Sequence, residues 1–191
     1  MFIPAEGCVL VDADYSQIEL RLLAHMAGDE AMIAAFRSGG DFHAETAAKV
    51  FHVAPDQVTH EMRRQAKAVN FGIVYGISAF SLSQDIGVSV AEAKAYMEKY
   101  FEKYSGVHAY MTQVVERAKA DGYVSTLMGR RRWLPELKSS NFNLRSFGER
   151  VALNMPIQGT AAGHHQAGYD PGAGPPAPRG AGGPSGAPGT R

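Results

Sequence analysis

Glycine and proline are distributed so unevenly that the chain divides into two parts of different composition. Residues 163–191 hold 9 of the 21 glycines and 6 of the 10 prolines, and residues 1–162 hold the other 12 and 4. A segment this rich in glycine and proline buries too little apolar surface to offset the entropy lost on ordering. We therefore expect one folded region over residues 1–162 and a disordered, low-complexity tail over residues 163–191.

Charge and cysteine content exclude several classes of protein. The 19 basic and 19 acidic residues cancel, so net charge gives no argument for a nucleic-acid or membrane partner, although local basic patches remain open. Cys8 is the single cysteine, which excludes a disulfide framework and a cysteine-based zinc site. No N-terminal signal segment is visible, and no apolar run reaches the roughly 18 residues that a membrane helix needs. These features predict a cytoplasmic protein without a membrane partner.

The spacing of apolar residues predicts mostly helices. Ile18, Leu22 and Met26 recur at four-residue intervals, which indicates a helix over residues 17–36. Further helices are predicted over residues 42–53, 60–75, 90–104, 107–120 and 143–154, the last ended by Pro156. Strands are predicted at Cys8–Val11 and in a β-hairpin of Tyr123–Leu127 and Arg131–Leu134 that turns at Gly129. The predicted fold class is therefore helix-rich α+β.

Acidic residues gather where the first predicted strand meets the first predicted helix. Asp12 and Asp14 end the strand and Glu19 follows about one helical turn later, a grouping of carboxylates that suits a hard divalent cation. Helix capping by Asp14 or Ser16 is the simpler interpretation of this spacing. Glu19 stands among apolar residues and either faces solvent or serves a binding function, so the segment alone leaves both interpretations open.

A second group of residues places basic and aromatic side chains on one helix face. Arg63, Lys67, Phe71 and Tyr75 follow one another at four-residue intervals, so each is displaced by only about 40° around the helix axis. Cations hold phosphates, and an aromatic ring stacks on a base or packs on a sugar. Such a face fits a nucleotide held at its triphosphate and at its base. A solvated basic turn followed by core aromatics explains the spacing equally well.

Several segments resemble one known family in the family's own order. Asp14–Arg21 (DYSQIELR) resembles motif A of the family A, or polymerase I type, bacterial DNA polymerases, and Arg63–Gly76 (RRQAKAVNFGIVYG) resembles motif B, the mobile fingers helix. Gly129–Arg132, Leu134–Glu136 and Asn154–Thr160 are similar to the segments that follow. The resemblance covers residues 2–162, and several long motifs in the correct order make it specific.

The resemblance implies part of a right-hand polymerase fold, with palm and fingers. Residues 1–36 would be a strand, turn and helix of the palm, residues 37–122 the fingers helices, and residues 123–162 a return to the palm with a DNA-contacting hairpin and helix. The implied activity is template-directed nucleotidyl transfer with two Mg²⁺ ions, serving DNA replication and repair. The implied partners are primer–template DNA and deoxynucleoside triphosphates, and the protein is expected to be monomeric.

The family's functional residues carry over to the matching positions. Asp14 would be one of two aspartates that bind the Mg²⁺ pair, with the backbone carbonyl of Tyr15 as a further ligand. Catalytic contacts to the triphosphate would come from His43, Arg63 and Lys67. The nucleotide-binding residues would be Gln17, Glu19, Phe71 and Tyr75, and the DNA-binding residues would be Arg150, Asn154 and Gln158.

Three of these roles are specific in what they imply. Glu19 would lie under the incoming sugar and reject ribose, which would explain an acid in an apolar setting. Phe71 would pack against the sugar and discriminate against dideoxynucleotides, and Tyr75 would lie near the template base. Arg130, Arg131 and Arg132 fit either phosphate-backbone contacts or a solvated turn.

The sequence departs from the family after Ala162. Motif C of the family carries His-Asp-Glu, whose aspartate is the second metal carboxylate, and that tripeptide is absent from the 191 residues. We therefore expect a fragment, with Met1 at an internal position, and negligible polymerase activity from this chain alone. Two alternatives stay open. One is a non-catalytic nucleotide- or DNA-binding module, and the other is a truncation product without a stable fold, because an incomplete palm sheet exposes strand edges.

The genetic code offers an explanation of the tail. When residues Gly163–Pro171 are back-translated and every codon is begun one nucleotide later, the pattern admits Asp-Ile-Ile-Lys-Leu-Ala-Met-Thr, as the family continues. The same shift lets Pro188–Arg191 admit Gln-Val-His-Asp, the start of motif C, with a stop codon directly after Arg191. We therefore hypothesise a one-nucleotide insertion near the Ala162 codon, which would make the tail an out-of-frame translation.

Overall fold

Eight α-helices and one small hairpin make up the part of the chain that the computed structural model describes, residues 3–10 and 14–168. The helices are α1 (Ile18–Ala27), α2 (Glu30–Arg37), α3 (Phe42–Phe51), α4 (His60–Val74), α5 (Ala79–Ile86), α6 (Val90–Lys103), α7 (Ser105–Asp121) and α8 (Phe142–Gly168). The strands are β1 (Tyr123–Ser125) and β2 (Arg131–Trp133), and short 3-10 helices span Pro55–Gln57 and Pro135–Lys138. None of these helices combines the length and hydropathy that crossing a bilayer requires.

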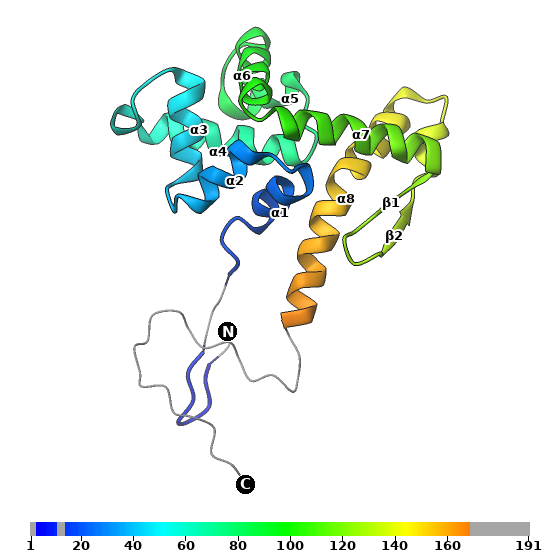
Figure 1. Cartoon of the computed structure of the whole chain (residues 1–191), viewed down its shortest axis with the longest axis horizontal. Coiled ribbons are helices and arrows are strands. Elements are labelled where there is room, and N and C mark those ends of the chain that lie inside the picture. Colours follow the sequence, from blue (N-terminus) through cyan, green and yellow to red (C-terminus); the bar gives the residue numbers. More distant parts are fainter. Residues whose placement is uncertain (1–2, 11–13, 169–191) are drawn as a thin grey trace.

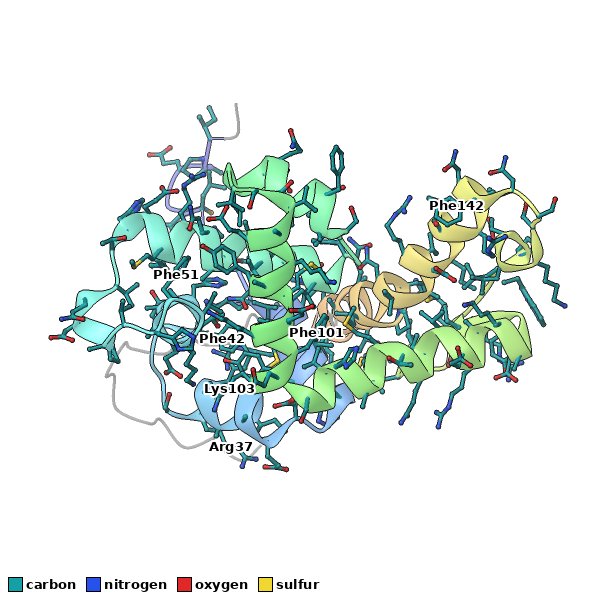
Figure 2. The ribbon with its side chains drawn as sticks, turned by 90° about the horizontal axis from the view of Figure 1, so that it is seen from above. Arg37, Phe42, Phe51, Phe101, Lys103 and Phe142 are labelled. Atoms are coloured by element: carbon teal, nitrogen blue, oxygen red, sulfur yellow. The ribbon has the colours of Figure 1, made fainter. Side chains whose placement is uncertain are left out.

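The helices fall into a body and an extension. Helices α1 to α6 pack together, and α7 runs out of this body toward the hairpin and α8 (Figure 1). Seen from above, Phe42 lies inside the body, whereas Phe142 lies at the far end, where α8 begins (Figure 2). The exposed fractions agree, because Phe42 is buried and Phe142 is largely exposed. The helices and the hairpin together confirm the helix-rich α+β class predicted from the sequence.

Side-chain caps set where most of the helices begin. Asp29, Asp41, Thr59 and Ser78 each accept a hydrogen bond from a backbone N–H in the first turn of the helix that follows. Ser89 forms a capping box with Glu92 at the start of α6. Each cap satisfies a donor that has no partner inside its helix and contributes about 1 kcal/mol.

Two hydrophobic cores hold the molecule together. The larger core takes side chains from every helix from α1 through α7, and Leu20, Phe42 and Tyr100 are among its fully buried members. Ile157 of α8 also belongs to it. The smaller one lies between α7, the hairpin and α8. Its buried members are Ala118, Val124, Leu134, Leu137 and Ala152. Because α7 and α8 contribute to both, they connect the body to the extension.

The hairpin forms where the sequence predicts it. β1 and β2 pair antiparallel, with Tyr123 opposite Trp133 and Ser125 opposite Arg131. Gly129 has φ of 78°, a left-handed conformation that glycine adopts without steric cost. Val124 is buried, whereas β2 is exposed along its length. The hairpin therefore presents one strand to solvent and anchors the other in the smaller core.

Three sequence predictions are wrong in detail. The helix predicted over 17–36 is two helices, because Gly28 ends α1 with φ of 58° and Asp29 starts α2. Residues 8–10 form no strand, because no described segment pairs with them, and Val11 lies outside the described residues. Pro156 does not end the last helix, since α8 passes through it to Gly168.

The continuation of α8 has a physical cause. A proline inside a helix costs about 3 kcal/mol, but Pro156, Ile157, Thr160 and Ala161 are all buried on one side of α8. The burial of this face outweighs the local penalty. The beginning of the predicted tail, residues 163–168, is consequently helical. The remainder, residues 169–191, lies outside the described residues, so its predicted disorder and the shifted reading frame stay predictions.

Candidate functional site

Helix α4 carries the basic and aromatic face that the sequence predicts. Lys67 Nζ lies 6.0 Å from the centroid of the Phe71 ring, so the cationic and aromatic parts of the face adjoin. Lys67 is exposed and Phe71 is half-buried, and Tyr75, at the C-terminal cap, is 40% exposed. The alternative interpretation of the spacing, in which the aromatic residues belong to the core, therefore does not hold for Tyr75. Phe71 only packs against the edge of the core.

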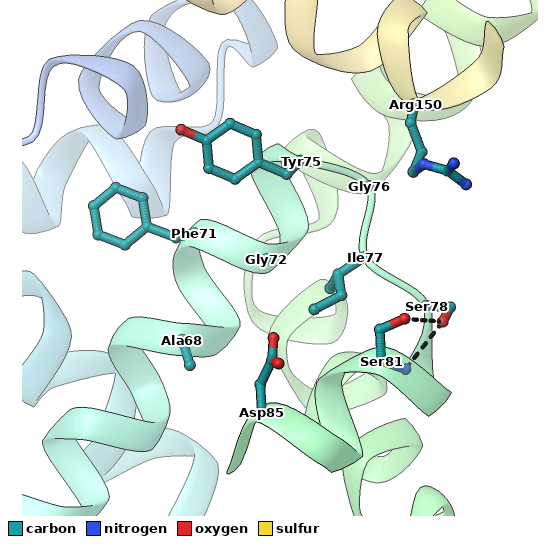
Figure 3. Close-up of a pocket in the computed structure, with 10 residues that line it drawn as sticks. All are labelled: Ala68, Phe71, Gly72, Tyr75, Gly76, Ile77, Ser78, Ser81, Asp85 and Arg150. Carbon is teal, nitrogen blue, oxygen red and sulfur yellow. Dashed lines mark hydrogen bonds between the residues drawn. The ribbon is translucent and has the colours of Figure 1, made fainter. Parts of the chain in front are cut away.

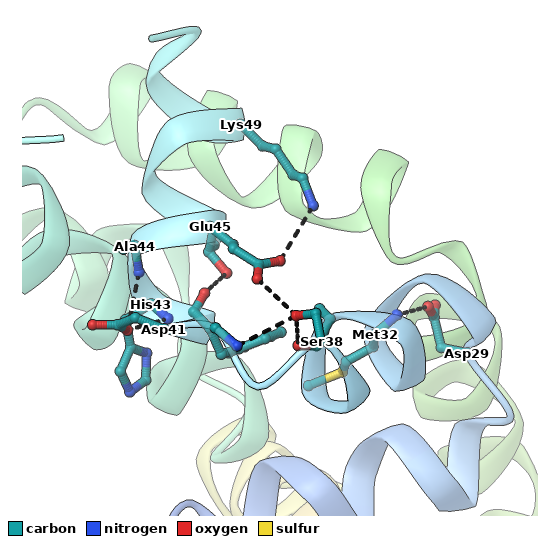
Figure 4. A network of polar contacts seen from close by, with 12 residues as sticks. Asp29, Met32, Ser38, Asp41, His43, Ala44, Glu45 and Lys49 are labelled. Carbon is teal, nitrogen blue, oxygen red and sulfur yellow. Dashed lines mark hydrogen bonds and ion pairs between the residues drawn. The ribbon is translucent and has the colours of Figure 1, made fainter. Parts of the chain in front are cut away.

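Arg63, at the start of this face, is held by an ion pair. Its Nε donates to Asp41 Oδ2 over 2.6 Å, and both side chains are partly exposed. Asp41 Oδ1 also accepts from the backbone N–H groups of His43 and Ala44 (Figure 4), so one carboxylate caps α3 and binds α4. Asp41 was missed by sequence reasoning, although an acid directly before a predicted helix is the ordinary signal of an N-cap.

His43 lies beside the same face but is nearly covered. Only 3% of its surface is exposed, and its ring centroid lies 5.8 Å from that of Phe71. Burial lowers the pKa of His43, and the positive charges of Arg63 and Lys67 lower it further, against the opposing effect of Asp41. A neutral imidazole is therefore placed next to two cations. The structure brings the three predicted triphosphate contacts, His43, Arg63 and Lys67, onto one side of the α3–α4 pair.

Glu19 has a specific partner. The Tyr75 hydroxyl donates to Glu19 Oε2 over 2.9 Å, which links the first turn of α1 to the end of α4. Partial burial raises the pKa of Tyr75, and its hydrogen bond to the carboxylate raises it further. The acid in an apolar helix is thus half-buried against the predicted nucleotide face. The sequence left open whether Glu19 faces solvent or serves a binding function. The structure places the Glu19 carboxylate within the predicted nucleotide face.

The acidic segment before α1 is open to solvent. Asp14 and Tyr15 are exposed, and Asp12 lies outside the described residues. Gln17 is the N-cap of α1, with φ of 56°, and no side chain caps the helix, so the predicted capping by Asp14 or Ser16 is wrong. Over residues 3–10 and 14–168, no three His, Cys, Asp or Glu side chains come together as a metal site would need. Asp14 therefore offers a divalent cation one carboxylate.

A pocket of about 590 Å³ connects the nucleotide face to α8. Phe71 and Tyr75, from α4 and its C-terminal cap, line one side, Arg150 of α8 lines another, and Asp85 of α5 lines a third (Figure 3). Nucleotide-binding and DNA-binding residues predicted from separate motifs thus meet at one cavity. Asp85 and the helix that carries it were not predicted, because the short segment 79–86 has no long apolar repeat.

The predicted DNA-binding residues follow one another along α8. Arg150, Asn154 and Gln158 are four residues apart and so lie on one stripe of the helix. Arg150 and Gln158 are exposed, and Asn154 Oδ1 is buried without a hydrogen-bond partner among the described residues. An unpaired buried acceptor costs about 1–3 kcal/mol. Arg150 and Gln158 are therefore the solvent-facing members of this stripe.

The three hairpin arginines are all exposed. Arg131 lies over the Tyr123 ring, with its guanidinium carbon 4.8 Å from the ring centroid. Tyr123 in turn contacts Trp133 at a centroid separation of 5.2 Å. The sequence left two interpretations open, contact with a phosphate backbone or a solvated turn, and the geometry permits both. An arginine stacked on a tyrosine can bind phosphate, and it is also a common arrangement on a solvent-exposed strand. Their contact with a phosphate backbone stays a prediction.

Comparison with known proteins gives one consistent answer. The family model for DNA polymerase family A matches residues 1–166. DNA polymerase I of Bacillus subtilis is 59% identical over 162 residues, which are 84% of this chain and 18% of that protein. DNA polymerase I of Geobacillus stearothermophilus is 56% identical over the same number of residues, again 84% of this chain and 18% of that protein. The chain therefore spans less than a fifth of the length of these curated relatives.

A solved structure shows the same likeness in three dimensions. The POL domain of Pol1 from M. smegmatis, in complex with DNA primer-template and dNTP, matches with a TM-score of 0.74 at 51% sequence identity. The match covers 78% of this chain and 26% of that chain. Sequence and fold therefore point to the same family.

Proposed function

Because this chain belongs to DNA polymerase family A, we propose that it forms the nucleotide- and template-binding part of a DNA-directed DNA polymerase that serves replication and repair. The observation that carries the proposal is the shared pocket, in which Phe71 and Tyr75 of the nucleotide face meet Arg150 of the DNA-binding stripe. Template-directed synthesis requires the incoming nucleotide and the template to be bound side by side. The M. smegmatis domain, bound to primer-template and dNTP, supports these two ligands.

Arg63, Lys67 and His43 would bind the triphosphate. Two cations and an imidazole on one side of the α3–α4 pair give charge-assisted hydrogen bonds to phosphate oxygens. Arg63 is tied to Asp41 in the free protein, so the triphosphate would compete with that carboxylate for the guanidinium. Nucleotide binding would therefore exchange one ion pair for another, which favours ligands with more negative charge than a single carboxylate.

The sugar and base would lie against the C-terminal half of α4. Phe71 would pack on the deoxyribose, Tyr75 would lie near the template base, and Gln17 and Glu19 would approach the nucleotide from α1. A Glu19 carboxylate beneath the sugar would leave no room for a ribose 2′-hydroxyl. Its hydrogen bond to Tyr75 supports this role because it holds the carboxylate against the nucleotide face.

Arg150, Asn154 and Gln158 would contact the primer and template. Their exposed stripe carries one cation, which suits a phosphate, and amide groups that suit base edges in a minor groove. Monomeric state and cytoplasmic location stay predictions.

Metal binding is the least complete part of the site. Family A DNA polymerases are generally metal-dependent, and Asp14 with the Tyr15 carbonyl would supply Mg²⁺ ligands in this chain. The described residues bring no three His, Cys, Asp or Glu side chains together and Asp14 is exposed, which does not fit a two-ion site. We expect binding, rather than synthesis, to be the measurable property of the 191-residue chain.

Two titrations of the full 191-residue chain test the proposal. Calorimetry with dGTP should give binding that Lys67→Ala weakens roughly tenfold, because a charge-assisted contact to phosphate is lost. Lys94→Ala is the matched control, since Lys94 is an exposed lysine on α6 that pairs with Glu98. Anisotropy of a labelled primer–template should show salt-dependent binding. Equal dGTP affinity in the two lysine variants would count against the proposed triphosphate site.

Primer extension distinguishes a working polymerase from the alternative, a non-catalytic binding module. Binding of dGTP and DNA without extension in Mg²⁺ fits a chain that contributes only the binding surfaces. Robust Mg²⁺-dependent extension by the same chain would show that the metal site is complete, contrary to our expectation.

A further inference from the structure

A buried amide contacts the imidazole of His43. Asn70 of α4 is fully buried, and its Nδ2 lies 2.9 Å from His43 Nδ1 and 3.4 Å from Thr46 Oγ1. Its own Oδ1 is buried and has no hydrogen-bond partner among the described residues. The Asn70 amide therefore donates to two groups on α3, whereas its oxygen has no partner. Leaving a buried acceptor unpaired costs free energy.

Thr46 decides which way the amide points. The Thr46 hydroxyl donates to the Phe42 carbonyl over 2.8 Å, so its oxygen can accept a hydrogen bond from Asn70 but has no hydrogen left to donate. If the amide were reversed, Asn70 Oδ1 would face the Thr46 oxygen, which has no hydrogen left to donate, and this contact would be lost. Asn70 Nδ2 is consequently the donor to His43.

This donor fixes the protonation of the ring. Because His43 Nδ1 accepts a hydrogen bond, it carries no proton, so the neutral ring carries its proton on Nε2. His43 Nε2 makes no hydrogen bond to the described part of the chain. The charged groups that act on the ring are Asp41 before α3 and Arg63 and Lys67 on α4.

We propose that Asn70 is a positioning residue that holds His43 as its Nε2–H tautomer, so that the imidazole donates to a phosphate oxygen of the triphosphate bound by Arg63 and Lys67. This inference rests on the proposed function for its ligand, but not for the tautomer. A neutral donor adds a hydrogen bond without adding a third positive charge beside two cations. The neutral imidazole is therefore not repelled by Arg63 and Lys67 when no phosphate is bound.

Nitrogen NMR of the imidazole tests the tautomer without any variant. In the full-length chain near neutral pH, the ¹⁵N shifts of His43 should identify protonated Nε2 and unprotonated Nδ1, with His43→Gln assigning the signal. A protonated Nδ1, or an even mixture of tautomers, would overturn the inference even if dGTP binds normally.

Substitution of Asn70 tests whether it causes the tautomer. In Asn70→Asp a buried carboxylate would accept from Nδ1–H, so His43 should titrate at higher pH and exist as the imidazolium near neutrality. Asn70→Ala should leave the ring neutral with mixed tautomers. Asn143→Ala, a change of an exposed asparagine on α8, is the control and should leave the His43 signal unchanged. An unaltered His43 titration in Asn70→Asp would contradict the inference.

Ligand binding separates this inference from the proposed function. Asn70→Ala should weaken binding of dGTP and of inorganic tripolyphosphate by a similar factor, roughly tenfold. Wild-type affinity in Asn70→Ala would remove the phosphate role of His43. No binding of either ligand by the wild-type chain would refute the proposed function instead, while the NMR result would still decide whether Asn70 sets the tautomer.

Discussion

The Tyr75 hydroxyl donates a 2.9 Å hydrogen bond to Glu19 Oε2 across 56 positions of sequence. It ties the C-terminal end of α4, the helix of the nucleotide face, to the first turn of α1. In this arrangement the carboxylate proposed to reject ribose is oriented by the ring proposed to lie near the template base. The position of α4 and the position of Glu19 are therefore linked.

Replacing Tyr75 by Phe removes this link without removing the ring. We expect the free energy of unfolding to fall by about 0.5–1 kcal/mol, because one partly exposed hydrogen bond to a charged group is lost. Urea denaturation measures the change. Tyr123→Phe is the control, because the Tyr123 ring contacts Trp133 and Arg131 but its hydroxyl has no hydrogen bond in the described part of the chain. Equal loss in both variants would mean that Glu19 does not hold Tyr75.

Gly76→Ala should disturb the pocket between α4 and α8. Gly76 has φ of 66°, and an added Cβ would lie 3.0 Å from Leu153 Cδ1 and 3.3 Å from Arg150 Cγ. The left-handed conformation alone costs about 1–2 kcal/mol for a non-glycine residue. Gly87→Ala is a matched control, because Gly87 has φ of 69° with nothing within 4 Å of its added Cβ. We expect the larger loss of stability, and weaker DNA binding, only in Gly76→Ala.

Arg150→Ala should lower the salt dependence of DNA binding. If Arg150 contacts one phosphate, the slope of the logarithm of affinity against the logarithm of salt concentration should fall by about 1. Anisotropy titrations with a labelled primer–template at several salt concentrations measure it. Arg117→Ala, a change of an exposed arginine on α7, should leave the slope unchanged. The same slope in wild type and Arg150→Ala would exclude the phosphate contact.

The Asp41–Arg63 pair should make stability depend on pH. Partial burial by itself would raise the pKa of Asp41, but the hydrogen bonds from Arg63 and Ala44 hold it below its ordinary value. The stabilisation is therefore present above the unfolded-state pKa of about 3.9, and it is lost as the pH falls through the lower folded-state pKa. Asp41→Asn keeps an N-cap acceptor but not the ion pair.

Denaturation at pH 7 and at pH 3 checks this sign. At pH 7 the wild type should exceed Asp41→Asn by less than about 1 kcal/mol, since the pair is partly exposed. The difference should shrink at pH 3. Asp56→Asn, at an exposed carboxylate without an ion pair in the described residues, should show no such change. A difference that grows on acidification would have the wrong sign for this pair.

Short-range patterns in the sequence were sufficient for much of the fold. Apolar periodicity predicted α3, α4, α6 and α7 within a few residues, and Gly129 marked the turn of the hairpin. The four-residue spacing from Arg63 to Tyr75 predicted a shared face because helix geometry relates those positions directly. The family resemblance, confirmed by the comparisons, was also contained in short contiguous motifs.

By itself, then, the sequence determined the family, the helical elements and the basic and aromatic face, since each depends on residues that are neighbours along the chain. Only the tertiary structure decided that Pro156 lies inside α8, that Asn70 contacts His43 across 27 positions, and that Glu19 contacts Tyr75. These features depend on which surfaces pack together. Burial of the α8 face offsets a local proline penalty, and the α3–α4 and α1–α4 contacts bring distant polar groups within hydrogen-bond distance.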